Sequence, residues 1–106
     1  MMTIIVNSGN IMPTIKLGTA QEVTIGASSA QSTIIGTAGQ TPNKLVRLSA
    51  TSACRIVTSG TNPTATATST YLPANVIEFT EITPGDKIAV IQEAAAGKLS
   101  ITECVL

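Results

Sequence analysis

Residues 75–105, NVIEFTEITPGDKIAVIQEAAAGKLSITECV, carry the clearest secondary-structure signals in the chain. Within residues 75–83, Ile77 and Phe79 alternate with polar neighbours. A period of two is typical of a β-strand that buries one face. This alternation predicts a strand whose Ile and Phe side chains point into the core.

Two further strands are predicted over residues 87–92 and 98–105. Thr83-Pro84-Gly85-Asp86 separates the first two strands and predicts a type II turn, because the third position of such a turn needs the positive φ that Gly adopts. The apolar positions of the three strands give the expected core residues: Ile77, Phe79, Val90, Leu99 and Ile101.

The rest of the chain is divided by Gly and Pro into further apolar runs of strand length. The composition agrees, since 13 Ile and 7 Val outnumber 6 Leu and β-branched residues suit pleated sheets. The 106 residues are therefore expected to form a single all-β domain, either a β-sandwich or a small β-barrel of about eight strands. The additional runs cover residues 3–6, 11–17, 22–25, 32–35, 43–50 and 53–58.

Three segments allow more than one interpretation. Residues 3–17 predict an ordinary pair of strands, but Gly9 and Pro13 also suit an extended N-terminal arm over residues 1–17 that lies on a neighbouring subunit. The tract over residues 64–70 is interpreted as an exposed, mobile loop, with an edge strand as the alternative. The two Cys residues, Cys54 and Cys104, are expected to be free thiols among apolar neighbours rather than a disulfide.

Composition excludes most chemistry. The chain has no His and a single Asp, and its Cys residues lack metal-site spacing, so we expect no enzyme, no metal and no cofactor. Its formal net charge is zero, which disfavours nucleic acid and anionic membrane as partners. The beginning of the sequence lacks the pattern of a secretory signal, which predicts synthesis in the cytosol.

What remains is a structural domain that acts by binding other proteins. Backbone pairing of an N-terminal arm would leave its Ile side chains to fill pockets on a neighbour. Tyr71 is a second candidate anchor, with a buried Tyr at the start of a strand as the more frequent alternative. The candidate partner-binding residues are Ile4, Ile11, Ile15 and Tyr71.

Residues 54–103 resemble small proteins of tailed-bacteriophage heads. The resemblance is carried by the order and spacing of Cys54-Arg55-Ile56, Thr61-Asn62-Pro63-Thr64-Ala65, Tyr71-Leu72-Pro73-Ala74, Glu78-Phe79, Pro84-Gly85-Asp86-Lys87-Ile88-Ala89-Val90-Ile91 and Gly97-Lys98-Leu99-Ser100-Ile101-Thr102-Glu103. Asn75 follows the third of these motifs where Gly is expected.

The resemblance implies a capsid decoration (cement) protein that binds the major capsid protein on the outer surface of the virion. It would be made in the host cytoplasm. We expect a homo-oligomer, with a trimer favoured because a lattice imposes its symmetry on what binds it. A phage tail or connector component is one alternative. An exported adhesin or carbohydrate-binding module is another, motivated by the many Thr and Ser residues but disfavoured by only two aromatic residues.

Overall fold

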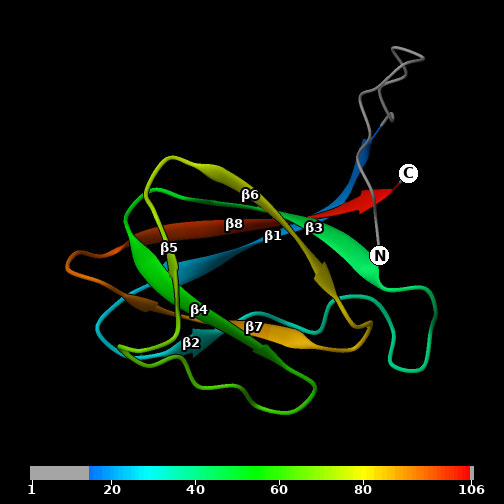
Figure 1. Ribbon diagram of the computed structural model, residues 1–106, viewed down its shortest axis with the longest axis horizontal. Helices are drawn as coiled ribbons and strands as arrows, with labels where there is room; N and C mark the ends of the chain where they lie inside the picture. Colours follow the sequence, from blue (N-terminus) through cyan, green and yellow to red (C-terminus); the bar gives the residue numbers. More distant parts are fainter. Residues whose placement is uncertain (1–14, 106) are drawn as a thin grey trace.

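The computed structural model describes residues 15–105 and shows two antiparallel four-stranded sheets packed face to face (Figure 1). Sheet A contains, in spatial order, β1 (Lys16–Ile25), β8 (Gly97–Val105), β3 (Lys44–Ala50) and β6 (Ile77–Ile82). Sheet B contains β2 (Ala30–Gln31), β7 (Lys87–Gln92), β4 (Cys54–Ser59) and β5 (Thr70–Leu72). The all-β prediction is confirmed, and the two separate sheets make the domain a sandwich.

The strand pairing follows a nested pattern. β1 pairs with β8, β2 with β7, β3 with β6 and β4 with β5, all antiparallel. Two further pairings, β3 with β8 and β4 with β7, join these ribbons into the two sheets. This is the strand order of a jelly roll, in which one long antiparallel ribbon is rolled into a sandwich.

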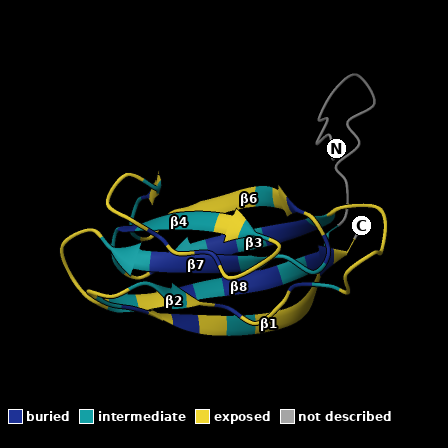
Figure 2. Ribbon diagram, turned by 90° about the horizontal axis from the view of Figure 1, so that it is seen from below, coloured by how far each residue is buried: buried dark blue, intermediate teal, exposed yellow. Residues whose placement is uncertain are grey.

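The core lies between the sheets and is almost entirely aliphatic. Figure 2 shows that buried residues concentrate in the central strands β3, β7 and β8. Val90, Leu99 and Ile101 are at most 1% exposed, which confirms three of the five expected core residues. Other core side chains come from both sheets and from the connection after β2, and they include Ile25, Ile35, Val46, Leu48, Leu72 and Ile88.

The other two expected core residues were assigned to the wrong face. Ile77 is 51% exposed and Phe79 is 45% exposed. The strand is present, but the opposite set of alternating side chains faces the core. The buried side chain of β6 is Ile82, at 2% exposure, which points to the opposite face from Ile77 and Phe79. The register with β3 sets this phase of the alternation: Ile77 and Phe79 lie opposite Ser49 and Arg47 on the outer face. Thr80 lies opposite the buried Val46 on the inner face.

The turns follow their residue chemistry. Gly85 has a φ of 97°, and the Asp86 amide donates a hydrogen bond to the Thr83 carbonyl at 3.0 Å, as the predicted type II turn requires. Asn75, which occupies a position where Gly was expected, itself adopts a φ of 60°. Asn is one of the few residues that tolerate this left-handed conformation. The turn before β6 is therefore made without Gly.

The first half of the domain differs from the predicted strands. Residues 16–25 form one strand, β1, with a register shift between Leu17 and Ala20, where two strands were expected. Residues 32–35 lie outside the strands, although their backbone still bonds to the β7 region through Ser32 and Ile35. The strand predicted over residues 3–6 lies outside the described residues.

The Thr-rich tract packs more closely than a freely exposed loop would. Ala65 is 2% exposed, Pro63 is also buried, and the Ala65 amide donates to Ser29 Oγ at 2.8 Å. The Lys87 ammonium donates to Asn62 Oδ1 at 3.3 Å. The expectation of an exposed loop is therefore confirmed for most of residues 64–69 and wrong for Ala65, and the edge-strand alternative holds only at Thr70, which begins β5.

Candidate interaction surface

The outer face of sheet A carries exposed apolar side chains at both edges. On β6, Ile77 and Phe79 point outward beside Ser49 and Arg47 of β3. On β1, Leu17 is 68% exposed. Val76, which precedes β6, is 41% exposed. We call Val76, Ile77 and Phe79 the β6 surface; it is the largest group of exposed apolar side chains close together in the sequence within the described chain.

β6 is exposed along its backbone edge as well as its face. Among residues 15–105, its only ladder partner is β3, so its other edge has no strand beside it. Proteins commonly block such an edge with charged side chains, Pro or a bulge. The sequence IEFTEI has no Pro and its register with β3 is regular, but Glu78 and Glu81 place two negative charges on it. The edge is therefore open to a strand that brings no further negative charge.

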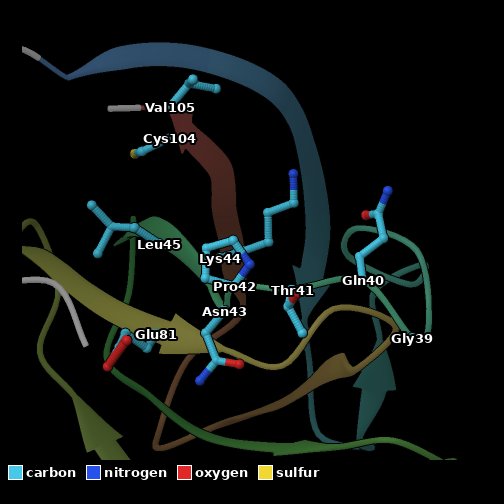
Figure 3. A pocket seen from close by; sticks show the side chains of 10 residues that line it. All are labelled: Gly39, Gln40, Thr41, Pro42, Asn43, Lys44, Leu45, Glu81, Cys104 and Val105. Carbon is cyan, nitrogen blue, oxygen red and sulfur yellow. The ribbon is translucent and has the colours of Figure 1, made fainter.

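A hollow of about 630 Å³ lies at one end of sheet A, where the segment over residues 39–43 leads into β3 (Figure 3). Figure 3 shows Leu45, Glu81 and Cys104 on one side of this region, while Lys44 turns away from them. The Lys44 ammonium instead lies 3.7 Å from a Glu103 carboxylate oxygen. The lining of the hollow is mixed: Leu45 and Cys104 are apolar, whereas Gln40, Asn43 and Glu81 are polar.

A polar cluster lies on sheet B. Arg55 Nε donates to Glu93 Oε1 at 2.9 Å, and its guanidinium carbon lies 5.0 Å from the centroid of the Tyr71 ring. The hydrogen bond from Arg55 lowers the pKa of the Glu93 carboxyl. The Tyr71 side chain is 46% exposed, so the alternative of a buried Tyr at this position is wrong. The Arg55 guanidinium lies over one face of the Tyr71 ring.

The two cysteines lie in different layers. Cys54 points into the core between the sheets, whereas Cys104 lines the hollow at the end of sheet A. Both are free and buried, as expected from the sequence. Burial raises the pKa of the Cys54 thiol to about 11 and also raises that of Cys104. Neither is therefore set up as a nucleophile.

This arrangement predicts slow modification by thiol reagents. At pH 7, a pKa of about 11 leaves roughly one Cys54 side chain in ten thousand as thiolate, and the thiolate is the reactive form. We expect no labelling of either cysteine in the folded protein over minutes, and two labelled cysteines per chain in denaturant. Mass spectrometry after treatment with iodoacetamide measures this. Rapid labelling of Cys54 in the native protein would contradict its placement in the core.

The candidate partner-binding residues are not brought together. Ile4 and Ile11 lie outside the described residues. Ile15 is half-buried just before β1 in sheet A, whereas Tyr71 is on β5 in sheet B. Sequence reasoning missed the β6 surface, because Ile77 and Phe79 were assigned to the core. Glu78 and Glu81 are three residues apart, so they lie on opposite faces of the strand. This spacing was the sign in the sequence that neither face is uniformly apolar.

Residues 15–105 contain no cluster of three His, Cys, Asp or Glu side chains that could hold a metal ion. Over the same residues, no helix has the length and apolar character needed to cross a bilayer. A scan against protein-family models and searches of curated proteins and of solved structures found no match. Fold and surface together define a jelly-roll β-sandwich with an exposed apolar edge strand.

Proposed function

We propose that this protein is a non-enzymatic bacteriophage virion component that binds the outer surface of the capsid and stabilises the shell. The observation that carries the proposal is the set of exposed apolar side chains at the two edges of the outer face of sheet A, with Phe79 on one edge strand and Leu17 on the other. The domain already has a closed core, so these side chains are not needed to fill it. Exposed apolar groups of this kind favour contact with another protein.

Two further features support the proposal. The resemblance of residues 54–103 to phage head proteins agrees with the jelly-roll strand order, an architecture that occurs in viral capsid domains and also in lectins. The formal net charge of zero suits a position outside the DNA-filled interior. In this proposal, the partner is the major capsid protein and the copies form a homo-oligomer, with a trimer favoured by the lattice symmetry.

Stabilisation would follow from preferential binding. A protein that binds the assembled shell more tightly than free capsid subunits shifts the equilibrium toward the shell. Many copies on one lattice add modest contributions to a large total. No covalent chemistry is required of the decorating protein, only a surface that is present on every copy.

The alternatives depend on other features. A tail or connector component would use the same outer face of sheet A and differs only in its location in the particle. A carbohydrate-binding module would rely on exposed aromatic rings. Tyr71 has one ring face against Arg55, and Phe79 lies on the other sheet, so the two aromatic residues do not form one sugar-stacking platform.

Fractionation of virions tests the proposal. Purified heads and tails are separated by density and probed for the protein, and the recombinant chain is then added to expanded heads that lack it. We expect co-sedimentation with heads, and heads that resist heat better after addition. A Phe79→Lys variant should bind heads at least tenfold more weakly, while Ile34→Lys, at a residue 53% exposed outside sheet A, serves as the matched control. Recovery only with tails, or binding to glycans without particles, would overturn the assignment.

A further inference from the structure

We propose that residues 3–6 of one copy pair with the open edge of β6 of a neighbouring copy and so extend its sheet A by one strand. The proposal goes beyond the proposed function and does not depend on it, because pairing between two copies needs no capsid. It concerns the backbone edge of β6, which is distinct from the outward side chains that would face the capsid. The two contacts are compatible, because an added strand leaves the outer face of the sheet exposed.

The acceptor is described by three observations already given. β6 has a ladder partner on one side only within residues 15–105, its register with β3 is regular, and its sequence has no Pro to block pairing. Its side chains are exposed on both faces, since Ile77 and Phe79 are exposed on one and Glu78 on the other. An incoming strand would thus meet apolar side chains on the outer face. Backbone hydrogen bonds would supply affinity, as in other cases of strand addition.

The negative charges on β6 favour residues 3–6, rather than β6 of a second copy, as the added strand. Pairing β6 with β6 of a second copy would bring Glu78 and Glu81 of both chains into one short ladder, and like charges on adjacent strands are destabilising. Residues 1–14, MMTIIVNSGNIMPT, contain no acidic or basic side chain. Their run Thr3-Ile4-Ile5-Val6 consists of residues with high β propensity. The uncharged run is the better partner for the acidic edge.

Topology favours a neighbouring copy over the same chain. The N-terminal segment precedes β1, and β1 and β6 are the opposite edges of sheet A. To reach β6 of its own domain, the segment would have to pass β8 and β3, which lie between the two edges. Residues 7–14 would link the paired run to β1, and eight extended residues reach at most about 29 Å. The run can therefore leave the β1 edge of its own copy and meet the β6 edge of an adjacent one.

Such a contact joins two different surfaces, the N-terminal segment of one copy and the β6 edge of another. Contacts of this heterologous kind generate rings when the rotation between copies closes. The oligomer expected on a symmetric lattice would thereby have a structural basis in sheet A. The strand-forming run would act as donor and β6 as acceptor in every copy.

The test is made in solution without capsids, so that its outcome is separate from that of the head-binding experiment. Light scattering coupled to size exclusion gives the mass of the full chain, of a chain that starts at Ile15, and of a full chain with Ile4→Asp and Val6→Asp. Ser8→Asp, outside the strand-forming run, is the matched control. We expect a closed oligomer for the full chain and the control, and monomers for the other two.

Hydrogen exchange identifies the acceptor. In the full chain, the β6 amides that face away from β3, every second one over residues 77–82, should exchange at least tenfold more slowly than in the Ile4→Asp, Val6→Asp variant. A synthetic peptide of residues 1–14 should restore this protection to the chain that starts at Ile15. A monomeric full chain, an oligomer that survives the Asp substitutions, or new protection at a site other than β6 would overturn the proposal. If the shortened chain fails to fold, the substituted full chain still decides the outcome.

Discussion

Replacing Ile101 with alanine is expected to lower the free energy of unfolding by about 2–5 kcal/mol, the range for truncating a large buried aliphatic side chain. Ile101 is 1% exposed and lies on β8, between β1 and β3. Truncating its side chain leaves a cavity in an aliphatic core. This core contains no aromatic ring that could move to fill the cavity. Urea unfolding followed by circular dichroism measures the loss.

Phe79→Ala is the informative control for this substitution. Aromatic residues usually rank among the costliest to truncate, but Phe79 is 45% exposed on an edge strand. We expect a loss below about 1 kcal/mol, because truncating an exposed side chain on an edge strand leaves no cavity in the core. Equal losses for the two variants would contradict the phase of β6 described above.

Gly85→Ala is expected to be comparably damaging, at about 2–5 kcal/mol, for a different reason. Gly85 has a φ of 97°, which an L-amino acid adopts only with strain. A Cβ atom placed there would also lie 2.8 Å from the Cα of Ala38, so that backbone would have to move. Both penalties fall on the turn that joins β6 to β7. Thermal unfolding monitored by circular dichroism gives the effect as a fall in Tm.

Two other glycines separate the two penalties. Gly39 has a φ of 87°, but a Cβ atom added there would meet no other atom within 4 Å, so Gly39→Ala should cost only the conformational strain, about 1–2 kcal/mol. Gly26 has neither a positive φ nor a close neighbour, and its substitution should leave stability unchanged or slightly raised. The expected order of damage is Gly85, Gly39, Gly26; a fall in Tm for Gly39 equal to that for Gly85 would show that the Ala38 contact is unimportant.

Local chemistry predicted much of the second half of the fold. The Pro84-Gly85 turn and the strands β7 and β8 were all predicted, because each depends on a few adjacent residues. Leu99 and Ile101 are buried as the alternation indicated. Such features are decided within one strand or turn.

Features that depend on distant partners were not predictable in this way. The face that β6 buries is set by its register with β3, which places Thr80 opposite the buried Val46 and Phe79 opposite Arg47. The length of β1 depends on β8, which supplies a partner on both sides of the irregularity near Gly18. The interaction surface was missed for the same reason, since alternation alone does not distinguish a buried apolar face from an exposed one.

The nested pairing of the jelly roll has a consequence for the order of folding. β4 and β5 are separated by 10 residues, whereas the end of β1 and the start of β8 are separated by 71, so the entropic cost of loop closure rises from the innermost pair outward. During synthesis on the ribosome, sheet A therefore waits for β8, which must lie between β1 and β3. We expect slow folding governed by this late insertion, and until it occurs β1 and β3 each lack the strand that joins them.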